Sequence, residues 1–245
     1  VKRVNLMSSF QIVSASRHQR TRVITDYHAS LGDSLMYTQT FPLEFRDIQS
    51  CYPIFFIKDP DSGQFLATAL FGFEAEENLF LNNRSWDASY LPMMIRRQPF
   101  LIARQGVDPA SPENTQPVIS IDMDHPRVNE SQGEQLFLDN GEPSVFLQEA
   151  IELMKNIHRA HQHNENFQQA LLKYDLLESL NLDITFNNGS KKSISHFYSI
   201  NESALYNLAG DALADLNKQG YLQPLFMAIA SLSRLRPLID RKDRP

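Results

Sequence analysis

Two adjacent arginines, Arg96 and Arg97, form the arrangement in this chain best suited to holding an anion. They follow the apolar stretch SWDASYLPMMI and precede QPF, so a short apolar segment positions them. A guanidinium group binds carboxylates and phosphates through a planar fork of donors. One interpretation is an internal ion pair with Glu77 or Asp122. The alternative is that the arginines anchor a ligand.

Aromatic and polar residues upstream of the arginines complete a candidate site. Trp86 and Tyr90 are four residues apart, so on a short helix they would share one face and supply flat apolar walls. The amide of Asn78 adds a further polar group. The candidate ligand-binding residues are therefore Glu77, Asn78, Trp86, Tyr90, Arg96, Arg97 and Asp122.

Metal-binding, phosphate-binding and nucleophilic sites have weaker signals. The run HRAHQH places His158, His161 and His163 where we expect a helix to end, which favours a solvated helix terminus over a metal site. Acidic pairs such as Asp122 and Asp124 could bind a divalent cation but usually are solvated. The patterns H-E-x-x-H, GxGxxG, GxxxxGK[ST] and GxSxG are absent. The single cysteine, Cys51, excludes an internal disulfide and is expected to be a small buried hydrophobe. We expect no metal and no cofactor.

Composition limits the class of protein. The chain has 245 residues, is 42% hydrophobic and has a formal net charge of −6, which is typical of a globular protein and disfavours nucleic acid as a partner. No stretch approaches 18 apolar residues, so no membrane span is predicted. The N-terminal segment lacks the apolar core of a secretory signal. The default expectation is the cytoplasm, with the cell surface, reached without a cleaved signal, as the alternative. Basic residues gather near both ends of the chain, which indicates either solvated, frayed termini or a docking patch for an acidic partner or anionic lipid.

The elements that must position these residues fall into a β-rich and a helical part. Residues 1–40 read as a loosely structured lead-in. Within 41–142, the runs 52–57 and 64–73 flank a Pro/Gly turn and predict a β-hairpin whose first strand is buried on both faces. Further strands are predicted at 78–81, 99–104, 118–122 and 134–139, with a short helix or turn near YLPMMIRR.

The part from 143 to 245 is mainly helical. Ser144 and Asn164 are predicted to cap two successive amphipathic helices. A hairpin over 182–200 follows, and Asn201 caps a third helix that Gly220 stops. Pro224 fits the first turn of a fourth helix, which Pro237 ends or kinks. We therefore predict a single α+β domain over 41–245, with a mostly antiparallel β-rich N-terminal half packed against a helical C-terminal half that contains one hairpin.

The whole pattern resembles the SapC family, named for a protein associated with bacterial surface layers. The resemblance runs from about Phe41 to Lys242 and rests on the order and spacing of short motifs. The residues that carry it are Tyr52-Pro53, Leu70-Phe71-Gly72, Glu77-Asn78-Leu79-Phe80, Trp86, Tyr90-Leu91-Pro92, Arg96-Arg97, Pro99-Phe100, Ile121-Asp122, Gly141-Glu142-Pro143 and ASLSRLRPLIDRK.

The resemblance implies a link to surface-layer and outer-membrane uptake loci but carries no catalytic residues. Two functions are open. The first is a non-catalytic binding or accessory protein of a bacterial envelope, surface-layer or outer-membrane uptake system. The second is an enzyme or ligand-binding protein acting on a small molecule or peptide, with its site around Glu77, Trp86 and Arg96. Convergence of these side chains in one cleft would favour the second.

Overall fold

The computed structural model describes residues 9–105 and 116–243 of the chain. Its central feature is a five-stranded antiparallel sheet in the order β12-β13-β4-β5-β3. The strands are β3 (Tyr37–Gln39), β4 (Ile54–Lys58), β5 (Phe65–Leu70), β12 (Leu177–Thr185) and β13 (Lys191–Ile200). The sheet therefore joins strands from both halves of the chain. The α+β class is confirmed, although the two halves interleave instead of packing as separate layers.

The predicted β4–β5 hairpin is present. Ile54 pairs with Ala69 and Lys58 with Phe65, around the turn from Asp59 to Gly63. The Asp59 carboxylate accepts a hydrogen bond from the Ser62 amide at 3.0 Å, and Gly63 has a φ of 72°, which favours glycine. Three consecutive residues of β4, starting at Ile54, are buried, so this strand is covered on both faces as its continuous apolar sequence indicates.

Three smaller sheets complete the strands. The strands β1 (Phe10–Ile12), β9 (Gln116–Asp122) and β8 (Phe100–Gln105) form one, in that order. The second is β10 (Val128–Asn129), β2 (Arg22–Val23) and β11 (Glu134–Gln135), and the third is the ribbon of β6 (Leu81–Asn82) and β7 (Ser85–Trp86). Where strands are predicted at 78–81 and 134–139, the structure has only the two-residue strands β6 and β11.

Residues 9–40, expected to be a loosely structured lead-in, contribute three paired strands. β1 pairs with β9, β2 with β10 and β11, and β3 with β5. Each of the first two partners lies about a hundred residues further along the chain. Local sequence patterns do not reveal such pairings, because a two- or three-residue strand has no periodicity of its own.

The N-terminal part also carries short helical segments. They are α1 (Ala15–His18), η1 (Ala29–Leu31), η2 (Pro42–Glu44), α2 (Phe45–Cys51) and α3 (Met93–Arg96). The last of these confirms the short helix predicted near YLPMMIRR.

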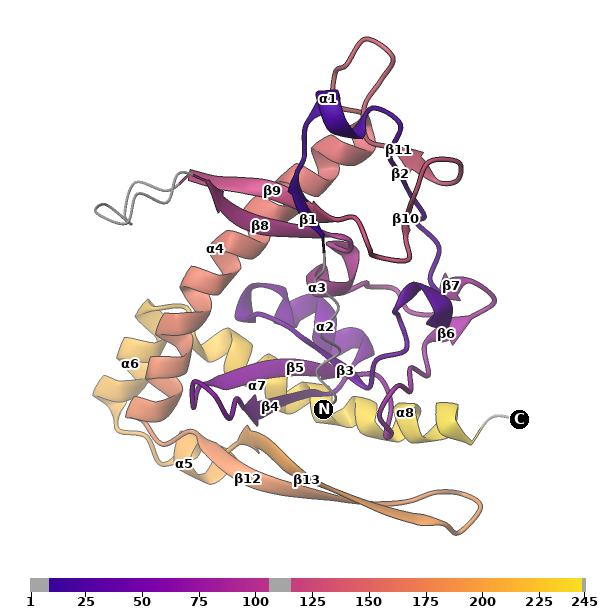
Figure 1. Cartoon of the computed structure of the whole chain (residues 1–245). Helices are drawn as coiled ribbons and strands as arrows, with labels where there is room; N and C mark the ends of the chain where they lie inside the picture. Colours follow the sequence, from indigo (N-terminus) through magenta and orange to yellow (C-terminus); the bar gives the residue numbers. More distant parts are fainter. Residues whose placement is uncertain (1–8, 106–115, 244–245) are drawn as a thin grey trace.

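The long helix α4 (Val145–Lys173) runs along one side of the molecule, from the small β10-β2-β11 sheet to α6 (Figure 1). Ser144 caps it as predicted, since its side chain accepts a hydrogen bond from the Leu147 amide at 3.2 Å. The prediction of a second helix capped by Asn164 is wrong. Asn164 lies inside the helix and is 4% exposed, between the buried residues Ala160 and Phe167. The apolar spacing continues through this point, so the helix does too.

The remaining helices follow the β12–β13 hairpin. They are α5 (Glu202–Tyr206), α6 (Gly210–Lys218), α7 (Leu222–Ser231), η4 (Leu232–Arg234) and α8 (Leu235–Lys242). Asn201 caps α5 by accepting from the Ala204 amide at 2.9 Å, as predicted. The single helix expected between Asn201 and Gly220 is broken into α5 and α6. Pro237 lies in the first turn of α8, where its missing N–H costs nothing, so the bend precedes it.

Two apolar cores hold these elements together. The larger lies on the five-stranded sheet and includes Phe55, Phe71 and Leu225. The smaller lies between the first half of α4 and the β8–β9 strands and includes Phe41, Phe100 and Met154. The segment with α3 and the preceding loop lies where the two cores meet, because Met93 belongs to one core and Ile95 to the other.

Candidate functional site

A pocket of about 490 Å³ opens beside α3, between the 25–27 segment and α4. Aromatic, aliphatic and charged side chains share its wall. The lining residues are Thr25, Tyr27, Ser89, Tyr90, Leu91, Arg96, Phe100, Phe146, Glu149, Ala150 and Leu153. Its size falls within the range of small-molecule sites. Two of the seven residues predicted from sequence, Tyr90 and Arg96, therefore meet in one pocket.

A buried carboxylate fixes Tyr90 and the start of α3. Glu44 is 3% exposed and accepts hydrogen bonds from the Tyr90 hydroxyl at 2.8 Å, the Met93 amide at 3.0 Å and the Thr40 hydroxyl at 2.7 Å. Burial raises the pKa of Glu44, and these hydrogen bonds oppose that shift. Because Glu44 ties both Tyr90 and the first turn of α3, it sets the direction in which the helix presents Arg96.

Arg96 brings a positive charge to the pocket. It is exposed, and no ion pair joins it to a carboxylate within residues 9–105 and 116–243. Its charge opposes the rise that burial causes in the phenol pKa of Tyr27 and Tyr90. Glu149 of α4 is exposed and lines the same pocket. The pocket thus carries one group of each sign from two different elements.

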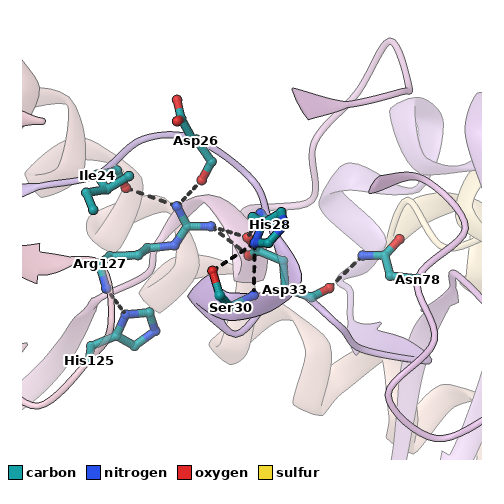
Figure 2. Close-up of polar contacts among 8 residues, drawn as sticks. All are labelled: Ile24, Asp26, His28, Ser30, Asp33, Asn78, His125 and Arg127. Carbon is teal, nitrogen blue, oxygen red and sulfur yellow. Dashed lines mark hydrogen bonds and ion pairs between the residues drawn. The ribbon is translucent and has the colours of Figure 1, made fainter. Parts of the chain in front are cut away.

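The segment that carries Tyr27 is anchored by a second buried group. Arg127 and Asp33 form a two-pronged ion pair with both N–O distances at 2.6 Å, and their side chains are 3% and 0% exposed. The same guanidinium donates to the Ile24 carbonyl at 3.0 Å and to the Asp26 carbonyl (Figure 2). It also lies over the Tyr27 ring, 5.0 Å from the ring centroid. This wall of the pocket is therefore held by a guanidinium far away in sequence.

The predicted ion pair of Glu77 with Arg96 or Arg97 is wrong. Glu77 instead pairs with Lys242 of α8 and accepts a hydrogen bond from the Phe73 amide at 2.8 Å. The segment after β5 contacts the C-terminal helix, since Glu74 and Glu77 both pair with Lys242. Glu77 therefore closes a turn and holds α8 in place.

Asn78 and Trp86 also serve the fold. Asn78 donates to the Asp33 carbonyl at 2.8 Å (Figure 2) and accepts from the Phe80 amide at 3.0 Å, so it bridges two turns. Trp86 donates to the Tyr52 hydroxyl at 2.7 Å, and its ring stacks on Phe80. Trp86 ends β7 and Tyr90 follows in a loop, so the shared helix face predicted for them does not form.

Arg97 and Asp122 lie outside the pocket. Arg97 donates to the Phe100 carbonyl at 2.8 Å, and burial lowers the pKa of its guanidinium. Asp122, at the end of β9, accepts a hydrogen bond from the Asp124 amide at 3.1 Å. The two adjacent arginines therefore have different roles, since Arg97 ties down the chain and Arg96 faces the pocket.

The three histidines of HRAHQH lie within α4 and not at a helix end, and two of them contact aromatic rings. His161 contacts Phe41 with ring centroids 4.7 Å apart, and His163 contacts Tyr221 at 5.5 Å. Burial lowers the pKa of both imidazoles. In the part of the chain that the structure describes, no three His, Cys, Asp or Glu side chains are grouped as metal ligands.

The lining residues can bind and orient a ligand. A guanidinium, a carboxylate and two phenols stand around aromatic and aliphatic walls. The Tyr90 hydroxyl lies 2.8 Å from the Glu44 carboxylate, and the Ser89 oxygen lies 3.1 Å from the Cys51 sulfur. The lining set holds no histidine beside a hydroxyl, which is the arrangement that activates a nucleophile. The lining groups of this pocket offer a positive charge, a negative charge and hydroxyl groups beside apolar walls.

Comparison with known proteins identifies the family of the chain. The model of the SapC family matches residues 13–238. This protein belongs to the SapC family. No curated protein and no solved structure matches it.

The SapC match includes every residue of the pocket, from Thr25 to Leu153. Sequence reasoning missed five residues that line or anchor the pocket: Tyr27, Asp33, Glu44, Arg127 and Glu149. Glu44 did leave a signal, since it is the one acid in the apolar run FPLEF. The other four come from segments without periodicity or from an exposed helix face. Among the described residues of this SapC-family chain, no helix combines the length and apolar character that crossing a bilayer requires.

Proposed function

We propose that this SapC-family protein is a non-catalytic ligand-binding protein, which serves as an accessory component of a bacterial envelope, surface-layer or outer-membrane uptake system. The observation that carries the binding role is the pocket in which Arg96, without a carboxylate partner in the described chain, stands beside Tyr27, Tyr90 and Phe146. A guanidinium next to aromatic walls suits a small carboxylate with an apolar or peptide-like body.

The distribution of the candidate residues favours binding over catalysis. Glu77, Asn78, Trp86 and Asp122 each have a partner within the fold. A reaction centred on Glu77, Trp86 and Arg96 would need these groups to converge, whereas Glu77 lies against α8. The accessory role in an envelope or uptake system rests on the link that SapC membership implies.

The ligand chemistry also has a natural complement in Glu149. Arg96 and Glu149 line one pocket without forming an ion pair with each other. A free amino acid or short peptide carries a carboxylate and an ammonium group at once. Such a zwitterion would pair its carboxylate with Arg96 and its ammonium group with Glu149, whereas a ligand with a single charge would pair with only one of them.

Isothermal titration with two probes of equal size tests the binding role. N-acetyl-L-phenylalanine carries a carboxylate, and N-acetyl-L-phenylalaninamide is neutral. We expect the acid to bind about tenfold more tightly, because a charged hydrogen bond contributes about 1.5–3 kcal/mol and 1.4 kcal/mol is a factor of ten. Equal binding, or binding of neither probe, would contradict the proposal. Hydrolysis of the amide in the same cell would favour the enzyme instead.

A further inference from the structure

A second cavity, of about 410 Å³, lies between the β8–β9 strands and α4. It shares no lining residue with the pocket beside α3. We call it the acyl groove, and its lining residues are Ile102, Val118, Ile119, Ile151, Met154, Lys155, His158 and Arg159. Five of these eight side chains are apolar and uncharged.

The fold builds one apolar side and one basic edge into the acyl groove. Ile102 of β8 and Ile119 of β9 are direct partners across the strand pair. On α4, the lining positions from Ile151 to Arg159 follow the spacing i, i+3, i+4, i+7 and i+8, which is one helix face. The apolar residues occupy the N-terminal part of that face and the basic residues the C-terminal part. The cavity is therefore polarised along α4.

The charges at the basic edge are not all compensated. Lys155 pairs with Glu152 at 2.7 Å, so its charge is balanced on the helix surface. Arg159 bonds to the neutral side chain of Asn156, and no carboxylate within the described residues pairs with it. His158 is half-buried beside it. In a protein of net charge −6, this leaves a local positive site at one end of an apolar cavity.

We propose that the acyl groove binds a single acyl chain with a carboxylate head, that is, a free fatty acid. The chain occupies the cavity between β8–β9 and α4, and the carboxylate lies at Arg159 and His158. The volume and the apolar wall match a small-molecule site with a few placed polar groups. The guanidinium supplies the planar fork that a carboxylate accepts. This inference is independent of the function proposed for the Arg96 pocket.

Methyl-labelled NMR with dodecanoate as the probe tests the groove directly. The δ1 methyl groups of Ile102, Ile119 and Ile151 are expected to shift saturably, whereas that of Ile54 in the central sheet stays in place. Dodecyltrimethylammonium, with the same chain and a cationic head, should bind at least threefold more weakly. Absence of saturable shifts at the three methyl groups, or equal affinity for both head groups, would overturn the proposal.

Variants separate the head group from the cavity. Arg159→Gln should weaken dodecanoate binding about threefold to tenfold, while Arg236→Gln, which changes an exposed arginine on α8 outside the groove, should leave it unchanged. Ile119→Thr should weaken the binding of dodecanoate and of dodecyltrimethylammonium alike. If this variant fails to fold, Arg159→Gln still tests the proposal, because Arg159 is exposed. If the methyl groups respond to anionic phosphatidylglycerol vesicles but not to dodecanoate, the face is a membrane-docking surface and the fatty-acid proposal fails.

Discussion

Asp33 and Arg127 are two buried charges that stabilise one wall of the Arg96 pocket only as a pair. Removing one partner strands the other charge in the interior, which costs about 3–5 kcal/mol. We therefore expect Arg127→Met or Asp33→Asn to lower the free energy of unfolding by about that amount in urea titrations. The exposed pair of Arg84 and Asp26, with side chains 57% and 49% exposed, is the matched control. Arg84→Ala should cost at most about 1 kcal/mol.

A result in which Arg127→Met and Arg84→Ala cost the same would contradict the buried pair. The Arg127 variant should also free the 24–26 backbone, since two carbonyl groups there lose their donor. Faster amide exchange confined to residues 24–33 is the readout that distinguishes this local anchor from a general loss of stability.

Glu44 makes stability depend on pH in a defined direction. Burial raises its pKa above the ordinary value of about 4.3, so the native state binds more protons than the unfolded state between the two pKa values. The stabilisation that comes from protonated Glu44 is therefore fully present below its pKa in the unfolded state, and it is lost as pH rises through its pKa in the folded state. Glu44→Gln removes this titration but turns an N–H donor toward other donors, which costs about 1–3 kcal/mol.

The deficit of Glu44→Gln relative to the parent should thus be largest near pH 4 and should shrink as pH rises. Urea unfolding curves between pH 4 and pH 8 measure it. A deficit that grows with pH would show that the hydrogen bonds to Glu44 outweigh its burial and hold it as the ion, which would contradict the raised pKa.

Helix α4 is continuous where its sequence predicts a break, and one substitution distinguishes the two arrangements. If Asn164 began a helix, Asn164→Ala would cost about 1 kcal/mol through the lost cap. Inside a helix, the buried Asn164 side-chain oxygen has no hydrogen-bond partner, and alanine is the better helix former by up to about 0.7 kcal/mol. We expect Asn164→Ala to leave the free energy of unfolding unchanged or to raise it.

Ser144→Ala is the matched control for that helix. The Ser144 hydroxyl accepts from the Leu147 amide and donates to the Gln135 carbonyl at 2.6 Å. Its loss should cost about 1–2 kcal/mol. A comparable loss for Asn164→Ala would mean that a cap exists at Asn164 and that α4 is two helices in solution.

Elements with their own periodicity were the ones that sequence could predict. The β4–β5 hairpin, the β8 and β9 strands, the β12–β13 hairpin and the caps at Ser144 and Asn201 follow from turn residues and local spacing. β1 and β2 could not be predicted, because each is two or three residues long and exists through a distant partner. The pocket follows the same rule: Tyr90 and Arg96 are neighbours in sequence, whereas Tyr27 and Glu149 reach it only through tertiary packing.

The N-terminal segment is docked through close backbone contact between β2 and residues 128–135, which lie about a hundred residues further along the chain. Gly133 has a φ of 89°, and a Cβ there would lie within 2.1 Å of the Val23 carbonyl oxygen in β2. Gly63 has a φ of 72° but nothing within 4 Å of such a Cβ. Gly133→Ala must therefore displace β2 from β11, while Gly63→Ala bears only the cost of its backbone conformation, about 1–2 kcal/mol.

Thermal unfolding of the two glycine variants measures this difference. Gly133→Ala should lose clearly more stability than Gly63→Ala, and its β2 amides should exchange faster. Equal losses would mean that the segment from β1 to β2 is not docked as described, and that the expected loose lead-in is the better description of it.

The most direct test of the Arg96 pocket is the affinity of N-acetyl-L-phenylalanine for the parent protein, Arg96→Gln and Arg236→Gln by isothermal titration. Arg96 and Arg236 are both exposed arginines, but only Arg96 lines the pocket. The account predicts at least a tenfold loss of affinity for Arg96→Gln, with its preference for the acid over the amide abolished, and no change for Arg236→Gln. Undiminished binding by Arg96→Gln would contradict the assignment of this pocket as the ligand site.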